Sequence, residues 1–215
     1  ENAVPLSKKM AQNDSVEGLI ASSYLNLLQQ NIQQAIQLAQ KALEKDPDNC
    51  HVYNHLARAL QNSGQSNKAL QNFAKAVAIE PDYSQAWHNL GQTQRAVGQL
   101  GIAISSYKNA LENQSGLLNI ALTYSAQDDY QQARVHFEKL LEINPQHLQG
   151  LVNAGLNYHY MGDFANSDAC YIKAIDADPN YPLTYCYKGI LHNELQETEP
   201  ALQCLIKAVQ LDPNE

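Results

Sequence analysis

The stretch that decides the fold spans residues 50–83 and reads CHVYNHLARALQNSGQSNKALQNFAKAVAIEPDY. Apolar side chains recur in its first half at the i, i+3, i+4 and i+7 spacing of an amphipathic helix: Tyr53, Leu56, Ala57 and Leu60. A second apolar stripe follows at Ala69, Phe73 and Ala76. Gly64 separates the two stripes, and Pro81 ends the second because proline cannot continue the helical hydrogen-bond ladder. The stretch therefore predicts two helices joined by a short turn.

The same two-helix pattern recurs along the whole chain. Similar phrases end at Pro47, Pro81, Pro145, Pro179 and Pro213, and three of these four intervals are 34 residues long. The remaining interval of 64 residues holds one unit of 34 and one of 30. One helix pair cannot bury its own apolar face, so neighbouring pairs must stack. We expect an N-terminal tail or cap (1–15) and then six units: 16–49, 50–83, 84–113, 114–147, 148–181 and 182–215.

Two departures from regular repetition are expected to affect the stack. The third unit is four residues short and lacks its terminal proline, so residues 111–116 must turn the chain in less space. We expect an altered helix–helix angle there, dividing units one to three from units four to six. The sequence given ends at Glu215 without a further capping helix. Since solenoids need a polar terminal cap, the last helix is expected to expose apolar surface, to self-associate, or to continue into further sequence, and we favour the third.

Composition and charge exclude several classes of function. The chain has 215 residues and a net charge of −8, with 14 Lys and Arg against 22 Asp and Glu. Nucleic acid is therefore not an expected partner, because phosphate contacts depend on clustered cations. No apolar run approaches the length of about 18 residues that a membrane-spanning helix needs. The four cysteines form no CxxC pair, which favours reduced thiols in a reducing compartment and so a cytoplasmic location. We also expect a bacterial source.

The repeating unit resembles the tetratricopeptide repeat (TPR). The third unit carries that motif most closely, with Trp87, Leu90, Gly91, Ala103, Tyr107 and Ala110 at the motif positions. The first unit is the weakest match, because Ser22, Ser23 and Asn26 replace the usual Leu, Gly and Tyr. The resemblance implies an all-α, right-handed solenoid of antiparallel helix pairs, whose first helices line a concave groove that binds peptides. It implies a protein–protein interaction module that is not an enzyme and needs no cofactor.

The resemblance also assigns candidate peptide-binding residues to the first helices. Units two and three would present a polar surface made of Asn54, His55, Arg58, His88, Asn89 and Gln92. Units four to six would present an apolar surface with embedded amides, made of Asn119, Leu122, Asn153, Leu156, Tyr160 and Tyr187. We expect most of the affinity to come from apolar contacts in units four to six.

Asn89, Asn119 and Asn153 occupy equivalent places in three successive units. An asparagine side chain both donates and accepts, so a row of them can hold a peptide by its backbone amides. This row resembles the asparagine ladder in the TPR arm of O-linked N-acetylglucosamine transferases. The alternative is that these residues only form a solvated helix face. A carboxylate clamp of the kind found in chaperone-binding TPR proteins is not expected, because the basic pair that should follow Asn89 is missing.

No motif in the sequence points to catalysis or to a metal. The histidines His51, His55 and His88 could together approach a zinc ion, but no thiol or carboxylate is placed by the sequence to complete that set, and we expect no metal site. Neither GxSxG, GxGxxG nor the P-loop pattern occurs. The aromatic residues at motif positions are expected to be core: Tyr53, Trp87, Tyr107, Phe137, Tyr171 and Tyr185.

Other functions stay open from the sequence. The chain could be the substrate-recognition arm of a larger bacterial enzyme of the glycosyltransferase or sulfotransferase type, since such enzymes carry TPR arrays before their catalytic domain. It could also be a structural scaffold that self-assembles through its C-terminal end. A pilus or secretion-assembly protein is a further alternative for which no residue argues.

Overall fold

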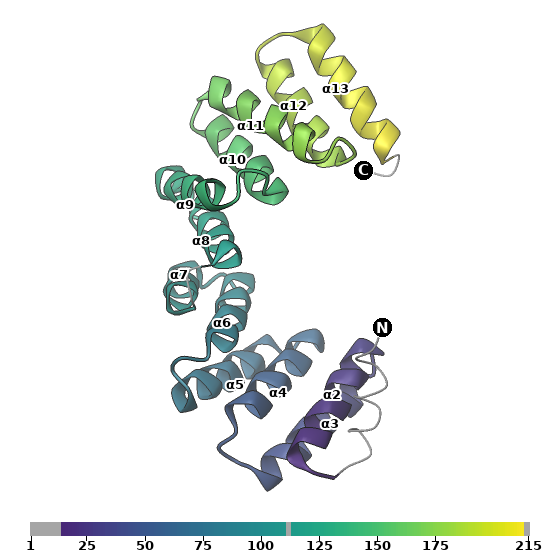
Figure 1. Ribbon diagram of the computed structural model, residues 1–215, viewed down its shortest axis with the longest axis vertical. Coiled ribbons are helices and arrows are strands. Elements are labelled where there is room, and N and C mark those ends of the chain that lie inside the picture. Colours follow the sequence, from purple (N-terminus) through teal and green to yellow (C-terminus); the bar gives the residue numbers. More distant parts are fainter. Residues whose placement is uncertain (1–13, 111–112, 213–215) are drawn as a thin grey trace. The chain divides into compact units, whose positions relative to one another are not determined.

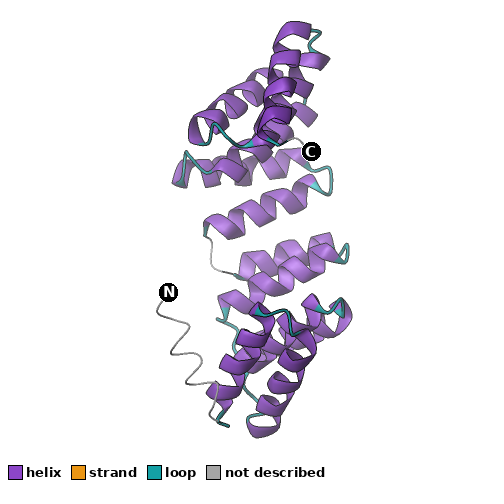
Figure 2. Cartoon of the chain, turned by 90° about the vertical axis from the view of Figure 1, so that its right-hand side faces the viewer, coloured by secondary structure: helices purple, strands orange, loops and turns teal. Residues whose placement is uncertain are grey.

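The computed structural model describes residues 14–110 and 113–212, so most of the predicted N-terminal tail or cap lies outside the described residues. Twelve α-helices make up the described part of the chain, and no strand occurs in it (Figure 2). The chain divides into two compact units, Glu1–Leu111 and Glu112–Glu215, here called unit 1 and unit 2. The six repeating units of the sequence are called repeats from here on. The division falls in the shortened third repeat. The predicted change of helix angle at this place stays a prediction.

Unit 1 contains three helix pairs (Figure 1). Its helices are α2 (Val16–Leu28), α3 (Ile32–Lys45), α4 (Cys50–Asn62), α5 (Ser66–Ile79), α6 (Ser84–Ala96) and α7 (Leu100–Asn109). Each first helix packs against its own second helix, and α3 and α5 also contact the first helix of the next pair. The first helices contact one another, α2 with α4 and α4 with α6. Their side chains therefore share one continuous layer within unit 1.

Unit 2 repeats this arrangement. Its helices are α8 (Gln114–Ser125), α9 (Tyr130–Ile143), α10 (Leu148–Tyr160), α11 (Phe164–Ala177), α12 (Pro182–Glu194) and α13 (Thr198–Leu211). Here too the first helices are neighbours, because α10 contacts both α8 and α12. The predicted all-α fold of stacked helix pairs is confirmed. We keep the six repeat boundaries as a proposal.

A residue with positive φ reverses the chain inside every repeat. Glycine fills this place in three repeats, at Gly64, Gly98 and Gly162, with φ of 77°, 81° and 74°. Gln30, Asp128 and Gln196 fill it in the others, with φ of 62°, 58° and 62°. A left-handed residue after a helix lets the next backbone N–H groups bond to the last carbonyls of that helix. Three of the six turns thus adopt the left-handed conformation without glycine, the residue for which it is least costly.

Small residues on first helices let large rings from second helices approach closely. A Cβ at Gly91 would lie 2.8 Å from the ring of Tyr107, and one at Gly155 would lie 2.5 Å from the ring of Tyr171. Both rings are fully buried, as is Phe137 in the corresponding place on α9. The two glycine–ring contacts hold α6 close to α7 and α10 close to α11.

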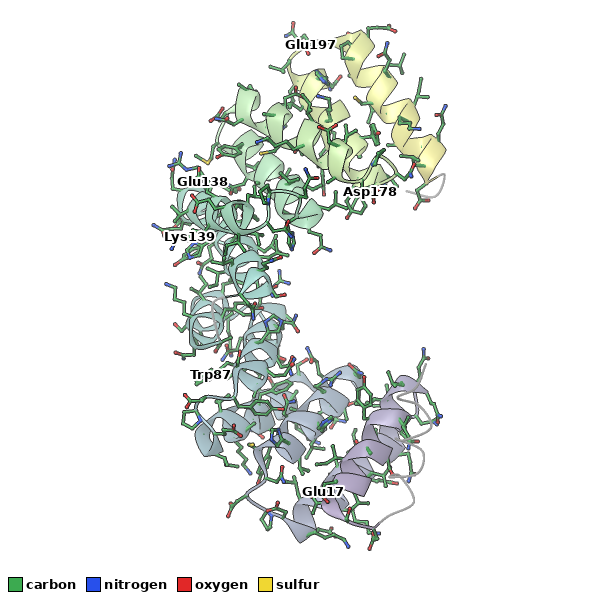
Figure 3. The ribbon with its side chains drawn as sticks, viewed as in Figure 1. Glu17, Trp87, Glu138, Lys139, Asp178 and Glu197 are labelled. Carbon is green, nitrogen blue, oxygen red and sulfur yellow. The ribbon has the colours of Figure 1, made fainter. Side chains whose placement is uncertain are left out.

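The other three aromatic residues predicted to be core are only partly buried: Tyr53, Trp87 and Tyr185. The Nε1–H of Trp87, a residue labelled in Figure 3, donates to the carbonyl of Pro81 at 2.7 Å. Tyr185 Oη donates to the carbonyl of Pro179 at 3.0 Å. These rings therefore bridge the loop before their own helix, where the polar ring atom reaches a backbone acceptor. Tyr53 and Trp87 also pack against the hydrophobic core of unit 1, so these rings border the core and are not fully enclosed by it.

The last described helix, α13, exposes a row of apolar side chains. Ala201 is its only buried residue, whereas Leu202, Ile206 and Val209 are 52%, 48% and 56% exposed.

Helices of the described segments are each too short or too polar to cross a membrane.

Candidate functional site

The first helices of unit 1 carry two adjoining cavities of opposite chemistry. A polar cavity of about 500 Å³ lies along α4 and α6, and its lining includes no carboxylate among the described residues. It is lined by Asn54, His55, Arg58, Gln61, Asn62, Tyr83, Gln85, Asn89 and Gln92. An apolar cavity of about 480 Å³ lies along α2 and α4, lined by Glu17, Ile20, Ala21, Tyr24, His51 and His55. His55 lines both cavities, so they adjoin at its ring.

A buried amide network supports the polar cavity. The Nδ2 of Asn89 donates to Oδ1 of Asn54 at 2.9 Å, and Nδ2 of Asn54 donates to Tyr83 Oη at 3.2 Å. Asn54 and Asn89 are only 2% and 8% exposed. Burial raises the pKa of Tyr83, with the nearby Cys50 adding to the shift, so its hydroxyl is protonated at neutral pH. The network joins α4 to α6 and holds the amide groups in fixed orientations.

His55 and Arg58 stand beside the ring of Tyr24. The imidazole of His55 meets the Tyr24 ring edge-on, with centroids 6.2 Å apart, and the guanidinium of Arg58 lies 5.8 Å from the centroid of the same ring. Burial, and secondly the charges of Arg58 and His51, lower the pKa of His55 to about 4. The ring is therefore neutral at pH 7. Its Nδ1 is buried and has no hydrogen-bond partner within the described segments, so a ligand could supply one.

Five of the six polar residues predicted for the second and third repeats line the polar cavity, and His88 does not. The ring of His88 packs edge-on against Tyr107 of α7, with centroids 5.8 Å apart, and burial lowers its pKa. It precedes Asn89 by one residue, and one step along a helix turns a side chain by about 100°. The structure therefore places His88 toward the second helix of its own repeat.

The sequence reasoning missed the residues of α2 that form the apolar cavity: Ile20, Ala21 and Tyr24. The first repeat matches the TPR motif weakly, so the motif does not indicate these residues. Their spacing was a usable signal, because positions 20, 21 and 24 follow the i, i+1, i+4 pattern of one helix face.

The asparagines of the predicted row have different surroundings. In unit 2, Nδ2 of Asn119 donates to the carbonyl of Ser115 at 2.9 Å and Nδ2 of Asn153 donates to that of Gln149 at 2.7 Å. Both bonds are made within one helix, and both side chains are partly exposed. Asn89 instead is buried and bonds to a neighbouring helix. The peptide-binding role of the row stays a prediction.

The two tyrosines predicted for unit 2 stack on other tyrosine rings. Tyr160 is 59% exposed and stacks on Tyr130 with centroids 5.2 Å apart. Tyr187 stacks on the buried Tyr171 at 6.4 Å. Leu122 and Leu156 are partly buried, and Leu122 packs against the core of the α8–α9 pair.

One cavity of unit 2, of about 370 Å³, uses none of these residues. It is lined by Phe137, Glu138, Leu141, Glu142, Ala154, Tyr158, Asn166, Ala169, Cys170 and Lys173. Tyr158 Oη donates to Glu138 at 2.9 Å across it, and burial together with this bond raises the pKa of Tyr158 to about 12. This cavity is formed by α9, α10 and α11, away from the residues that the sequence proposed.

The structure also gathers a group of metal-ligating residues that the sequence reasoning did not assemble. The ligand atoms of Cys50, His51 and Glu80 lie within 4.8 Å of one another. The Sγ of Cys50 donates to Glu80 Oε2 at 2.8 Å. Burial, and then the bond to Glu80, raises the pKa of the Cys50 thiol to about 11. A thiol and a carboxylate therefore do lie beside His51, contrary to the expectation from sequence.

Family models of the tetratricopeptide repeat match residues 38–71, 72–105, 114–147, 148–181 and 184–215. These matches cover most of the chain, and the chain belongs to the tetratricopeptide repeat family. Proteins of this family generally take part in protein–protein interactions. No curated protein sequence gives a significant match to the chain.

Solved structures share the fold at low sequence identity. The type IV pilus biogenesis factor PilW superposes with a TM-score of 0.80 at 16% identity, covering 98% of this chain and 95% of its own. The pilF protein of Pseudomonas aeruginosa gives 0.78 at 17% identity, covering 93% of each chain. YrrB, described as a TPR protein with an unusual peptide-binding site, gives 0.65 at 18% identity, covering 82% of this chain and 93% of its own. At these identities the likeness establishes the fold.

Proposed function

We propose that this chain is a non-catalytic interaction module, and that the first helices of unit 1 bind an extended segment of a partner protein. The observation that carries the proposal is the pair of adjoining cavities on α2, α4 and α6, one apolar and one polar, which share His55. A peptide presents successive side chains of different chemistry, so neighbouring pockets of opposite polarity suit an extended segment.

The apolar cavity is suited to an aliphatic or aromatic side chain of the partner. Tyr24 is the largest side chain of its lining, and aromatic residues that present a rigid face are common anchors of protein interfaces. Burial of such a side chain against Tyr24 and Ile20 supplies affinity through the apolar area removed from water.

The polar cavity is suited to hydrogen-bond acceptors. Its lining combines the Arg58 guanidinium with several side-chain amides, and no described residue of that lining carries negative charge. A partner carboxylate or a backbone carbonyl would therefore meet donors without an opposing charge. We propose that the partner carries an acidic or amide side chain next to its apolar anchor. The description of YrrB as a peptide-binding TPR protein is consistent with this kind of use of the fold.

The residues predicted in unit 2 are kept as a second, separate contact. Asn119 and Asn153 are partly exposed, so their amide oxygens can meet a partner, and Tyr160 offers an exposed ring. The bacterial source, the cytoplasmic location and membership of a larger enzyme remain predictions from the sequence.

The test is selection of peptides from a random displayed library on the whole chain, followed by affinity measurement. Selected peptides should pair an apolar residue with a nearby Asp, Glu, Asn or Gln. Tyr24→Ala and Arg58→Gln should each weaken binding at least about tenfold, which corresponds to about 1.4 kcal/mol. Arg134→Gln on α9 of unit 2 is the matched control and should not change the affinity. If the selected peptides bind both Tyr24→Ala and Arg58→Gln as tightly as the parent chain, the proposal is overturned.

A second candidate function, self-assembly, is favoured by the exposed apolar row on α13. Solenoid ends of this kind can pack against another helix. The second helices α3, α5, α9 and α11 each contact the first helix of the following repeat, whereas α13 contacts only α12 among the described helices. Sedimentation of the chain with Leu202→Gln and Ile206→Gln tests this. A mass that rises with concentration in the parent chain and not in the double variant would support self-assembly.

A further inference from the structure

We propose that Cys50, His51 and Glu80 form a binding site for a divalent transition-metal ion of the Zn²⁺ type. The three residues offer a sulfur, a nitrogen and an oxygen ligand whose atoms lie within 4.8 Å of one another. Nothing in the repeat motif requires these residues together. The site is separate from the two cavities described above, except that His51 also lines the apolar one.

The antiparallel helix pair explains how residues 30 positions apart meet. Cys50 is the first residue of α4, and Glu80 is the residue that follows the last turn of α5. Because α4 and α5 run in opposite directions, the start of one lies beside the end of the other. The contact is direct, since Cys50 Sγ donates to Glu80 Oε2 at 2.8 Å.

The geometry is close to what a tetrahedral ion requires. Two ligand atoms each about 2.1 Å from such an ion lie about 3.4 Å apart. The separations here are at most 4.8 Å, so a shift of about 1.4 Å at most closes the set. His51 and Glu80 are exposed and can make this adjustment by rotating their side chains, whereas Cys50 is buried and fixed.

The donor set selects the class of metal. Thiolate and imidazole ligands suit Zn²⁺ and neighbouring transition metals, whereas Ca²⁺ and Mg²⁺ take oxygen ligands, of which this set offers one. A thiolate and a carboxylate also neutralise the two charges of the ion at a partly buried place. Three protein ligands leave a fourth position for water or for a partner side chain.

Neighbouring residues support the start of α4 and contact the ring of His51. Its ring packs edge-on against Tyr83, with centroids 4.8 Å apart. The side chain of Asn49 caps α4 by accepting from the N–H of Val52, which fixes the turn that presents Cys50 and His51. Such outer contacts orient metal ligands in proteins.

Titration of the whole chain with Co²⁺ under reducing conditions tests the site, because a thiolate bound to cobalt gives a charge-transfer absorption band. We expect one equivalent of Co²⁺ to produce this band and Zn²⁺ to displace it. Cys50→Ser should abolish the band. His51→Ala and Glu80→Gln should weaken cobalt binding at least about tenfold, since loss of even an outer partner of a ligand commonly costs 10–100-fold.

Cys170→Ala is the matched control, because Cys170 is a thiol remote in sequence from the set and also has a pKa raised by burial, to about 11. It should leave the band unchanged. The exposed positions of His51 and Glu80 make their variants suitable even if Cys50→Ser perturbs folding, which circular dichroism would detect. Absence of the band in the parent chain, its persistence in Cys50→Ser, or unchanged affinity in both His51→Ala and Glu80→Gln would overturn the proposal and leave the Cys50–Glu80 contact as an ordinary hydrogen bond.

Discussion

The side-chain amide of Asn89 on α6 donates a 2.9 Å hydrogen bond to Oδ1 of Asn54 on α4, and both side chains are buried. Asn54 in turn donates to Tyr83 Oη. These hydrogen bonds connect the first helices of two successive repeats at the polar cavity, which Asn54, Tyr83 and Asn89 all line. It gives Asn89 a structural role that Asn119 and Asn153 do not share, although the three occupy equivalent places in the sequence.

Replacing Asn89 with alanine should lower the free energy of unfolding by about 1–3 kcal/mol, because the buried Oδ1 of Asn54 loses its partner. Urea-induced unfolding followed by circular dichroism measures this. Asn119→Ala is the control and should change the value by no more than about 0.5 kcal/mol, since its bond lies within one partly exposed helix. Equal effects of the two substitutions would show that the Asn54–Asn89 bond adds nothing to stability.

Adding a methyl group at Gly155 should destabilise the chain by about 1–3 kcal/mol, because the new Cβ would lie 2.5 Å from the buried ring of Tyr171. The same measurement on Gly101→Ala provides the comparison. A Cβ there meets no atom within 4 Å, and alanine is the better helix former, so stability should rise by up to about 1 kcal/mol. A Gly155→Ala protein as stable as the parent would mean that the ring can move aside without cost.

Acidification should destabilise unit 1 through His55. Its pKa is about 4 in the folded chain, lowered from 6.5 by burial and by the charges of Arg58 and His51. As the pH falls from about 6.5 toward about 4, the unfolded chain binds a proton that the folded chain does not. The contribution of His55 to stability is therefore complete above about pH 6.5 and is lost as the pH falls through this window.

His55→Gln isolates this effect. The groups facing His55 are Tyr24 of α2 and the Arg58 and His51 side chains of α4, and they remain in the variant. Between about pH 7 and about pH 4.5, the parent chain should lose about 2 kcal/mol more than the variant, and titrating carboxylates cancel in the comparison. Parallel stability curves for the two proteins would contradict a buried, neutral His55.

Leucines on the last helix pair should differ sharply in their effect on stability. Leu191 of α12 is fully buried, so Leu191→Ala should cost about 2–5 kcal/mol. Leu202 of α13 is 52% exposed, and Leu202→Ala should cost about 0.5 kcal/mol or less at low protein concentration. Thermal unfolding of both variants measures the contrast. A large loss for Leu202→Ala would show that this side chain is covered in solution.

The sequence by itself determined the helices and the class of fold. Apolar spacing of three and four residues fixes which face of each helix is buried, and glycine or proline marks its ends, so this information is local. The same helical spacing predicted that Asn54, Arg58 and Gln92 lie on one face of the first helices, where the polar cavity is found. Around Tyr24 the repeat motif is weak, so the motif does not indicate this face of α2, and the apolar cavity was not predicted.

Tertiary structure alone decided which partner each polar side chain meets. The Asn54–Asn89 bond joins residues 35 positions apart, and the Cys50–Glu80 contact joins residues 30 apart. His88 and Asn89 are adjacent in the sequence, but their side chains contact different repeats. The ring of His88 packs against Tyr107 of its own repeat, whereas Asn89 bonds to Asn54 of the preceding repeat. Such pairings depend on how far one helix is shifted and rotated against the next, and that offset follows from the packing of small residues against rings, which no local spacing records.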